Sequence, residues 1–384
     1  MTDQTDPGPS YRLITDRQSL EAVMPGLMRE NIVAMDIEAD SMYHFSEQVC
    51  LIQIATPDEC LLIDPLAVND ISPLEPLFSE PAITKVFHGA SYDVRCLDMC
   101  YHIKINNLFD TEIACRFLGS SETGLNAVLQ QIFQVVLDKK YQKKDWSRRP
   151  LSEEMLAYAA RDVLYLIPLW KILTQRLKAK NRMAWVAEEC RNISIARPVP
   201  ETVRPLFLKV KGSGRLNRRS LAVLESLLEM RLEIARKKDL PPFKVISPGA
   251  LIRLAEEKPA YFKALKRSGI LSEKQLAMYA EAVCSAVQKA LDMTNDNLPV
   301  YPREKRTPMS REVCLRVNAL KQWRETAAQQ IGIDSGFILP NALAIGIARQ
   351  NPQTVGQLDE ICEMKDWQKK TFGGEIIEVL NGVF

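Results

Sequence analysis

The sequence predicts an α/β domain followed by two all-helical domains. Short apolar runs of strand-like composition fill residues 31–110, and apolar residues at helical spacing dominate from about residue 111 onward. The helical C-terminal half also contains an internal repeat with an offset of 93 positions. A chain of 384 residues is longer than one ordinary domain, so two or three domains are expected.

The strands of the α/β domain are predicted from short apolar runs bounded by turn residues. The turn TPDE between the second and third runs predicts a hairpin. The runs are NIVAMDIEAD (31–40), VCLIQIAT (49–56), ECLLIDP (59–65) and KVFHG (85–89), with LFD (108–110) as a fifth candidate.

Helices are predicted where apolar residues recur every three to four positions. The predicted helices lie in TEIACRFLG (111–119), GLNAVLQQIFQ (124–134) and the long run at 152–180. Ser152 and the two glutamates after it suit the start of the last helix, because acids interact favourably with the N-terminal end of the helix dipole.

Proline-rich and polar stretches set the predicted domain limits. ARPVPETVRPL (196–206) and NDNLPVYPREKRTP (295–308) each contain three prolines. Six basic residues and no acid lie between Arg204 and Ser220, which suits either a solvated linker or a strap that contacts phosphates. We predict a disordered tail at 1–9, an α/β domain at 10–195, a linker at 196–215, a helical domain at 216–292, a linker at 293–308 and a second helical domain at 309–384.

The repeat pairs the two helical domains without a gap. A shift of 93 positions places Leu227 on Leu320 and Pro259 on Pro352. Sparse apolar matches also arise by chance in helical sequence, but the aligned prolines and the shared order of helices and loops favour a true repeat.

Composition narrows the class of protein. The nine cysteines form no CxxC pair, which predicts reduced thiols rather than a disulfide framework or a zinc site. There is neither an apolar run of about 18 residues nor an apolar signal core, so we expect no membrane partner and a cytoplasmic protein. The net charge of +2 predicts no partner by itself, and we expect a monomer.

Four acids of the α/β half stand in otherwise apolar segments. Asp36 and Glu38 share one face of a predicted strand, where like charges repel. Asp93 begins a predicted helix, and Asp162 lies four residues after Tyr158 on one face of another. Carboxylates in this arrangement suit hard divalent cations, and two such cations about 4 Å apart suit phosphoryl transfer.

Each acid also has an ordinary explanation. Strands often end in acids at a loop, Asp93 suits a helix cap, and Asp162 could pair with its neighbour Arg161 at the surface. Each of these explanations is more common than catalysis when it is taken alone. The combination of the four acids is what favours an active site.

Three motifs resemble, in sequence and in order, those of the DEDD 3′–5′ exonuclease superfamily. They are DIE (36–38), FHGASYD (87–93) and YAARD (158–162). The stretch 124–166 is similar to the ribonuclease D family, and the two repeats resemble HRDC domains, the second copy (320–352) more closely. Ala157 stands where the histidine branch of the superfamily has its histidine, so the tyrosine (DEDDy) branch is implied.

The resemblance implies a fold and a set of metal ligands. The fold is a ribonuclease H-like exonuclease domain, with a mixed five-stranded sheet flanked by helices, followed by two all-α HRDC-like domains. Asp36 would bridge two divalent cations, Mg²⁺ or Mn²⁺. Glu38 and Asp162 would hold the cation that carries the attacking water, and Asp93 would hold the other, near the leaving 3′ oxygen. Tyr158 would orient the water, because a phenol with a pKa of about 10 need not act as a base on a water acidified by metal.

Other residues match the motifs of the family with less defined roles. Asp110 is expected to support the ligands or the fold rather than to ligate. His88 and Tyr92 flank Asp93 as candidate substrate contacts, with a purely structural histidine as the alternative.

A basic stretch precedes the third motif. Lys139, Gln142 and Arg149 are candidate substrate contacts, the last two with the phosphates, whereas Trp146 is expected to pack. The basic run suits single-stranded nucleic acid, with a solvated loop as the alternative; it comprises Lys139, Lys140, Tyr141, Lys143 and Lys144.

The function expected from the sequence is metal-dependent 3′→5′ exoribonuclease activity that releases nucleoside 5′-monophosphates. The resemblance implies that the substrates are transfer RNA precursors and other small structured RNAs with 3′ extensions, which the helical repeats would bind. One alternative is a DNA 3′→5′ exonuclease of the same superfamily, and the lack of a helicase or polymerase segment in the sequence favours RNA. Another is a non-catalytic scaffold that binds nucleic acid, against which the intact set of acids argues.

Overall fold

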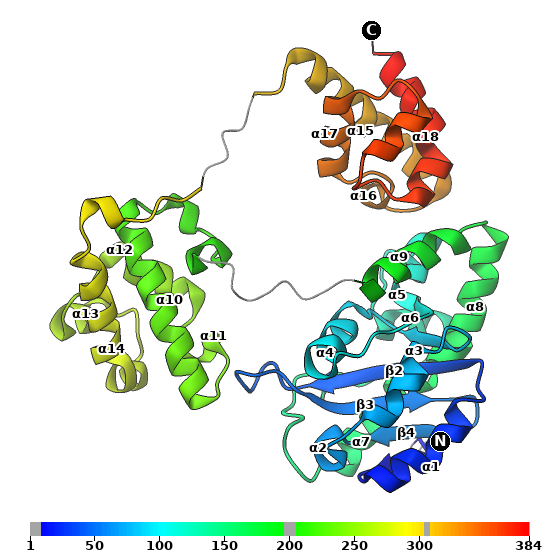
Figure 1. Ribbon diagram of the computed structural model, residues 1–384, viewed down its shortest axis with the longest axis horizontal. Coiled ribbons are helices and arrows are strands. Elements are labelled where there is room, and N and C mark those ends of the chain that lie inside the picture. The colour runs from blue at the N-terminus through cyan, green and yellow to red at the C-terminus, as the bar shows by residue number, and fades with distance from the viewer. Residues whose placement is uncertain (1–8, 196–204, 303–307, 384) are drawn as a thin grey trace, which may run out of the picture. The chain divides into compact units, whose positions relative to one another are not determined.

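The computed structural model describes residues 9–195, 205–302 and 308–383, which form two compact units (Figure 1). Within these residues, the first unit comprises 9–39, 49–195 and 308–383, and the second comprises 40–48 and 205–302. Apart from residue 9, the predicted disordered tail lies outside the described residues, as do parts of both predicted linkers.

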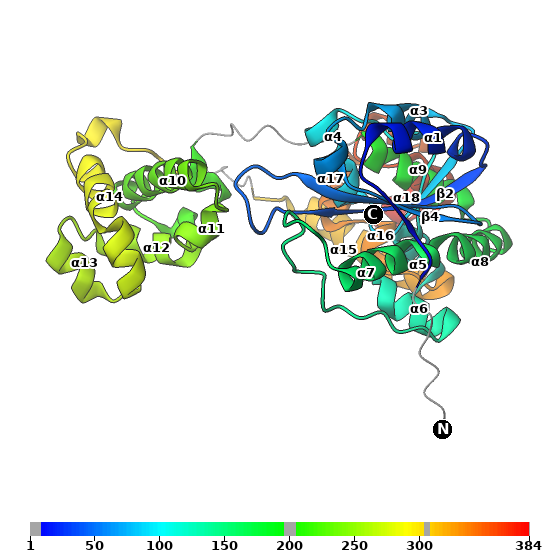
Figure 2. The same ribbon diagram turned by 90° about the horizontal axis from the view of Figure 1, so that it is seen from below.

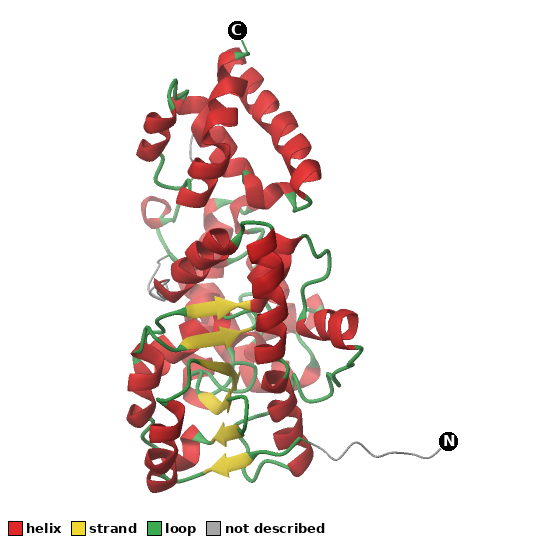
Figure 3. Cartoon of the chain, turned by 90° about the vertical axis from the view of Figure 1, so that its right-hand side faces the viewer, coloured by secondary structure: helices red, strands yellow, loops and turns green. Residues whose placement is uncertain are grey.

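A six-stranded mixed sheet forms the centre of the first unit, in the order β1-β4-β3-β2-β5-β6, with helices on both sides (Figure 3). The pairs β2–β3 and β3–β4 are antiparallel, which confirms the predicted hairpin, and the other three pairs are parallel. The strands are β1 Arg12–Ile14, β2 Ile32–Ala39, β3 Val49–Ala55, β4 Cys60–Ile63, β5 Thr84–Phe87 and β6 Leu108–Asp110.

The sequence prediction of five strands missed β1 at the edge of the sheet. Only the last of its three residues, Ile14, is buried, so the segment carries almost no alternation by which a strand is recognised. It becomes a strand by pairing in parallel with β4, a partner that lies about fifty residues further along the chain. The other five strands are confirmed.

Nine α-helices of the described residues accompany the sheet. The run predicted as a single helix at 152–180 is divided at Tyr165 into α7 and α8, because Pro168 lacks the N–H that would continue the hydrogen bonds of α7. The helices are α1 Arg17–Leu27, α2 Pro65–Val68, α3 Glu75–Ser79, α4 Ser91–Tyr101, α5 Thr111–Leu118, α6 Leu125–Phe133, α7 Glu153–Leu164, α8 Leu166–Ala179 and α9 Met183–Ile195.

The two helical copies have the same layout, which confirms the repeat. Each of the first three helices of one copy begins and ends 93 positions before its counterpart in the other. The first copy contains α10 Arg218–Lys238, α11 Pro242–Val245, α12 Pro248–Glu257, α13 Phe262–Ser268 and α14 Glu273–Leu291. The second contains α15 Arg311–Ile331, α16 Ser335–Ile338, α17 Asn341–Gln350, the 3-10 helix η5 Val355–Glu360 and α18 Asp366–Asn381.

The first copy begins earlier than its predicted limit. Residues 205–215, which the sequence placed in a linker, pack on α10 instead. Phe207 is fully buried in the core of this copy, and the Glu225 carboxylate accepts hydrogen bonds of 2.9 Å from two main-chain N–H groups of the segment. The prolines of this stretch indicated an irregular backbone but not that it folds onto a helix.

The segment 40–48, which joins β2 to β3, belongs to the second unit. Asp239, at the end of α10, accepts a hydrogen bond of 3.0 Å from the N–H of Phe45, and its carboxylate lies 2.6 Å from Nδ1 of His44. The segment 40–48 is therefore bound to the end of α10 within the second unit.

The second copy packs directly on the α/β domain and shares one hydrophobic core with it. Trp367 of α18 stacks on Trp185 of α9, with ring centroids 4.8 Å apart. Lys365 pairs with Glu189 at 2.5 Å, and the buried Arg182 donates hydrogen bonds to main-chain carbonyls of both parts. The aromatic and ionic contacts together bind the last helix of the chain to α9.

The cysteines agree with the expectation from composition. All nine cysteines are free thiols, as predicted. Cys190 is buried, and its sulfur accepts a hydrogen bond from the N–H of Asp110 at 3.2 Å. Among the described residues no helix is long and apolar enough to span a membrane.

Candidate active site

The central strand β2 presents two acids on one face. β2 is paired antiparallel with β3 over residues 34–39, which include both acids, and parallel with β5 over residues 32–34. Asp36 and Glu38 are half-buried, while Val33, Ala34 and Met35 before them are buried in the core. The alternation of the strand therefore holds both carboxylates on the same face.

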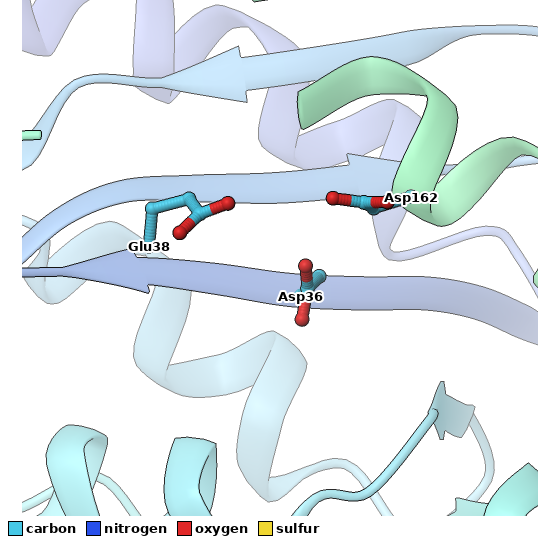
Figure 4. A group of neighbouring side chains, drawn as sticks. All are labelled: Asp36, Glu38 and Asp162. Atoms are coloured by element: carbon cyan, nitrogen blue, oxygen red, sulfur yellow. The ribbon is translucent and has the colours of Figure 1, made fainter. Parts of the chain in front are cut away.

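Helix α7 brings Asp162 to these two acids. The helix begins after Ser152, whose side chain accepts a hydrogen bond from the N–H of Met155, as the sequence predicted for its start. Asp36, Glu38 and Asp162 each offer a carboxylate oxygen, and these atoms lie within 4.8 Å of one another (Figure 4). Residues more than one hundred and twenty positions apart thus form one acidic cluster.

Asp93 lies in the first turn of α4, next to this cluster. It is only 5% exposed, and the N–H of Ile37 on β2 is a hydrogen-bond donor to its carboxylate. The negative charge of Asp93 raises the pKa of Glu38, and the negative charge of Asp36 raises the pKa of Asp93. The structure thus brings the four predicted acids into one electrostatic neighbourhood, with Asp93 outside the closest group of three.

Burial raises the pKa of every acid in the site, and repulsion between the acids raises three of these pKa values further. Removal from water raises the pKa of Asp36 to about 7. It also raises the pKa values of Glu38, Asp93 and Asp162 well above their usual range, and the charge of Asp36 adds to the effect in each case. The four carboxyl groups are difficult to ionise at the same time, and a divalent cation would stabilise their ionised forms. Their oxygen atoms are ligands that suit Mg²⁺ or Mn²⁺. The residues therefore fit such ions.

Without metal, these shifts make stability depend on pH. The unfolded carboxyl of Asp36 ionises near pH 4 and the folded one near 7, so the folded state binds more protons between these values and stability falls as the pH rises. We expect the melting temperature in chelator to fall from pH 5 to 8, and Asp36→Asn to melt about 5 °C higher at pH 8. Calorimetry at both pH values tests this, and the difference between the two proteins should be smaller at pH 5 than at pH 8. A variant that melts lower at pH 8 would contradict the assignment.

Tyr158 stands one turn before Asp162 on α7, and its hydroxyl is hydrogen-bonded to the Asp162 carboxylate. Burial and then the charge of Asp162 raise the pKa of this phenol above its usual value. Tyr158 therefore keeps its proton and donates a hydrogen bond, which fits an orienting role and not that of a base.

A pocket of about 320 Å³ opens beside these residues, between α7 and the basic run. Its lining includes Tyr158 and Asp162 of α7 together with Lys140 and Tyr141 of the basic run. The Tyr141 ring lies 5.9 Å from the Tyr158 ring, so the aromatic residue of the basic run is next to Tyr158. The structure brings part of the predicted basic run to the acids.

The other predicted substrate contacts occupy different positions. Lys139 and Gln142 are exposed in the loop that carries the basic run. The ring of Tyr92 lies under the guanidinium of Arg95 at 5.1 Å. His88 is half-buried, and its Nδ1 lies 2.9 Å from the hydroxyl of Thr111, so its observed contact is a structural one.

Arg149 has a structural role instead of the predicted contact with phosphates. Its guanidinium forms a two-pronged ion pair with Asp64, with N–O distances of 2.6 and 2.7 Å. Its remaining N–H groups donate to the main-chain carbonyls of Trp146, Arg148 and Cys50. All five donors are engaged, so none is left for a phosphate.

Asp110 and Trp146 have the supporting roles expected of them. The Asp110 carboxylate accepts hydrogen bonds of 3.0 and 2.8 Å from the N–H groups of Gly89 and Ala90, and it also caps the start of α5. It thereby ties β6 to the turn that leads into α4 and Asp93. Trp146 is buried, with its ring 6.1 Å from that of Tyr158, and packs behind the tyrosine.

Sequence reasoning missed two residues beside the acids. Gln53 of β3 is fully buried directly opposite Asp36, and neither polar atom of its side chain has a hydrogen-bond partner among the described residues. The register of an antiparallel pair would have revealed this, because opposite residues share a face. Arg161 lines the pocket, as its position three residues after Tyr158 on α7 implies.

Comparison with protein families agrees with this geometry. A family model described as 3′-5′ exonuclease matches residues 11–178, and the HRDC domain model matches residues 220–287 and 316–380. Fold, acids and matches together define a 3′–5′ exonuclease that carries two HRDC domains. The chain is 31% identical to ribonuclease D of Gluconacetobacter diazotrophicus over 78% of its length and 77% of that protein. It belongs to the ribonuclease D family, and it is a 3′–5′ exoribonuclease.

Two further relatives cover almost the whole chain. Ribonuclease D of Bartonella henselae is 29% identical over 97% of this chain and 90% of that protein. The crystal structure of Escherichia coli RNase D has a TM-score of 0.72 and 24% identity, covering 97% of this chain and 99% of that one, which shows the shared fold. The predicted fold class is thereby confirmed over both the sheet and the helical copies.

Proposed function

We propose that the protein is a metal-dependent exoribonuclease that trims the 3′ ends of transfer RNA precursors and other small structured RNAs. It would release nucleoside 5′-monophosphates. The observation that carries the proposal is the convergence of Asp36, Glu38 and Asp162 on one point, beside Asp93 and Tyr158. This arrangement contains the full set of acids and the tyrosine on which the resemblance depends.

The metal requirement follows from the donor set. The ribonuclease D family generally uses divalent ions; we propose two, Mg²⁺ or Mn²⁺. Asp36, Glu38 and Asp162 would hold one, and Asp93 would hold the second together with Asp36. When bound, such ions lower the pKa of water and neutralise charge on the phosphate that reacts.

The residues of the chain supply position and protons around this centre. β2 and α7 fix the three carboxylates with rigid backbone, so little reorganisation is needed when substrate binds. The protonated Tyr158 donates a hydrogen bond toward Asp162 and would orient the attacking water beside it. Lys140 and Tyr141, which also line the pocket, would contact the phosphate and the base of the terminal nucleotide.

RNA is preferred to DNA as the proposed substrate. The Escherichia coli relative is described as an exoribonuclease involved in structured RNA processing. Catalysis would tolerate any sequence, because the site offers charged groups for phosphates and not a pattern that reads base edges. A cytoplasmic location and a monomeric state stay predictions, as do the domain limits other than residue 216, the predicted start of the first helical copy.

Digestion of a 3′-extended transfer RNA tests the proposal. We expect removal of single nucleotides from the 3′ end in Mg²⁺ or Mn²⁺, a halt near the folded part of the RNA, and no digestion with a chelator. Product lengths on a sequencing gel report polarity and stopping point, and chromatography identifies the 5′-monophosphates. A DNA oligonucleotide of the same sequence serves as the comparison, and faster digestion of the DNA would favour the DNA exonuclease alternative.

A further inference from the structure

The first helical copy exposes two adjacent aromatic side chains at the start of α13. Tyr261 is 61% exposed and Phe262 is 55% exposed. Phe243 of α11 is also exposed, at 47%, whereas Phe207 lies against Tyr301 and Tyr279 lies under Lys238. Neither Tyr261 nor Phe262 has such a contact within the part of the chain that the structure describes.

Basic side chains frame the two rings. Lys263, Lys266 and Arg267 are all exposed, and no acid occurs between residues 258 and 272. Leu265 is fully buried, and successive helical positions turn by about 100°, so Lys263 and Arg267 point away from the core. α13 lies at the edge of its unit beside α14 (Figure 2). We call these five residues, Tyr261, Phe262, Lys263, Lys266 and Arg267, the aromatic–basic surface.

The second copy shows that the fold does not require this surface. Thr354 occupies the position of Tyr261 with the same backbone, φ −136° and ψ 155° against φ −141° and ψ 155°. The inward leucine is kept and fully buried in both copies, as Leu265 and Leu358. The same turn is thus built in both copies, so packing of the turn does not explain the aromatic pair.

The exposed positions of the second copy carry the opposite chemistry. Val355 stands in place of Phe262, and Asp359 and Glu360 stand in place of Lys266 and Arg267. Asp359 pairs with Lys369 of its own copy at 3.3 Å. Lys266 and Arg267, at the corresponding positions of the first copy, make no ion pair among the described residues. Their charges are therefore available to a ligand.

We propose that the aromatic–basic surface binds single-stranded RNA, with bases stacked on Tyr261 and Phe262. Lys263, Lys266 and Arg267 would contact the phosphates. Exposed rings flanked by cations suit a single strand, since every base has a flat face for stacking and every nucleotide carries a negative charge. A protein partner would have no comparable need for three unpaired cations. The inference rests on the proposed function as an exoribonuclease and assigns the first copy, not the second, to the RNA.

Binding to a fluorescent unstructured RNA tests the proposal in the full chain. The protein carries Asp162→Asn, so that RNA is not degraded and affinity is measured without turnover. We expect Tyr261→Ala with Phe262→Ala to weaken binding about tenfold, because stacking is lost. We expect Lys263→Gln, Lys266→Gln and Arg267→Gln together to reduce the slope of log affinity against log salt by about 2.

The internal repeat provides the matched control. Thr354→Ala with Val355→Ala, at the corresponding positions of the second copy, should leave affinity unchanged, and duplex RNA should bind equally to this control and to the aromatic variant. Unchanged affinity in both the aromatic and the basic variants would overturn the proposal and leave a protein partner as the explanation. Hydrolysis of a dinucleotide, measured with proteins that keep Asp162, separates the proposed RNA-binding surface from the proposed function. If the dinucleotide is not hydrolysed, the proposed function is refuted and the proposal for the surface is not.

Discussion

Replacement of Asp162 by asparagine is expected to reduce hydrolysis by about 10³-fold or more without unfolding the protein. The change removes one of three carboxylates that converge within 4.8 Å and keeps the shape of the side chain. Loss of a residue that only supports a metal ligand typically lowers activity 10–100-fold. Loss of a ligand itself should therefore lower activity by about a further tenfold or more. Asp36→Ala should have at least as large an effect. Single-turnover release of nucleotide from labelled RNA measures both.

Glu153→Gln is the matched control for this prediction. It removes the same charge from the same helix, but Glu153 is exposed in the first turn of α7, away from the acidic cluster. This variant should retain the activity of the unmodified protein. Asp162→Asn should also melt no lower than the unmodified protein in chelator, because it relieves the repulsion that raises the pKa of its neighbours. Full activity of purified Asp162→Asn or Asp36→Ala would refute the assignment of the site.

The sequence could predict where these acids lie on their elements, because each position is fixed by its own local structure. Asp36 and Glu38 share a face by the alternation of β2, and Asp162 follows Tyr158 by one turn of α7. To predict these placements, it is enough to know whether the segment is a strand or a helix. Their meeting in space depends on the sheet topology, which the resemblance supplied and which spacing alone could not.

Arg149 shows where such reasoning fails. Its place in a family motif and its charge suggested a phosphate contact, but its partner Asp64 lies 85 residues earlier in the chain. No local pattern connects the two. The burial of Phe207 and the stacking of Trp185 on Trp367 could not be predicted for the same reason. Whether an apolar residue faces solvent or another domain depends on segments far away in the sequence.

The ion pair of Arg149 with Asp64 leads to the second large effect, on stability. We expect Arg149→Met to lower the free energy of unfolding by about 3 kcal/mol, because it leaves a buried carboxylate without its cation. The Asp64 side chain is 6% exposed, and the main-chain N–H groups of Leu66 and Ala67 alone would remain as its donors. The 28% exposure of Arg149 places the estimate at the low end for a buried pair. Denaturant unfolding measures the loss.

Arg148 provides the control that separates structure from substrate binding. It is the adjacent residue with the same charge, but its side chain is 82% exposed, and its ion pair with Asp145 lies near the surface. Arg148→Met should change stability by less than about 0.5 kcal/mol. Asp64→Asn should reduce much of the penalty of Arg149→Met when the two are combined, since the buried charge is then absent. If Arg149→Met instead left stability unchanged and weakened RNA binding, the phosphate contact first predicted for this arginine would be correct.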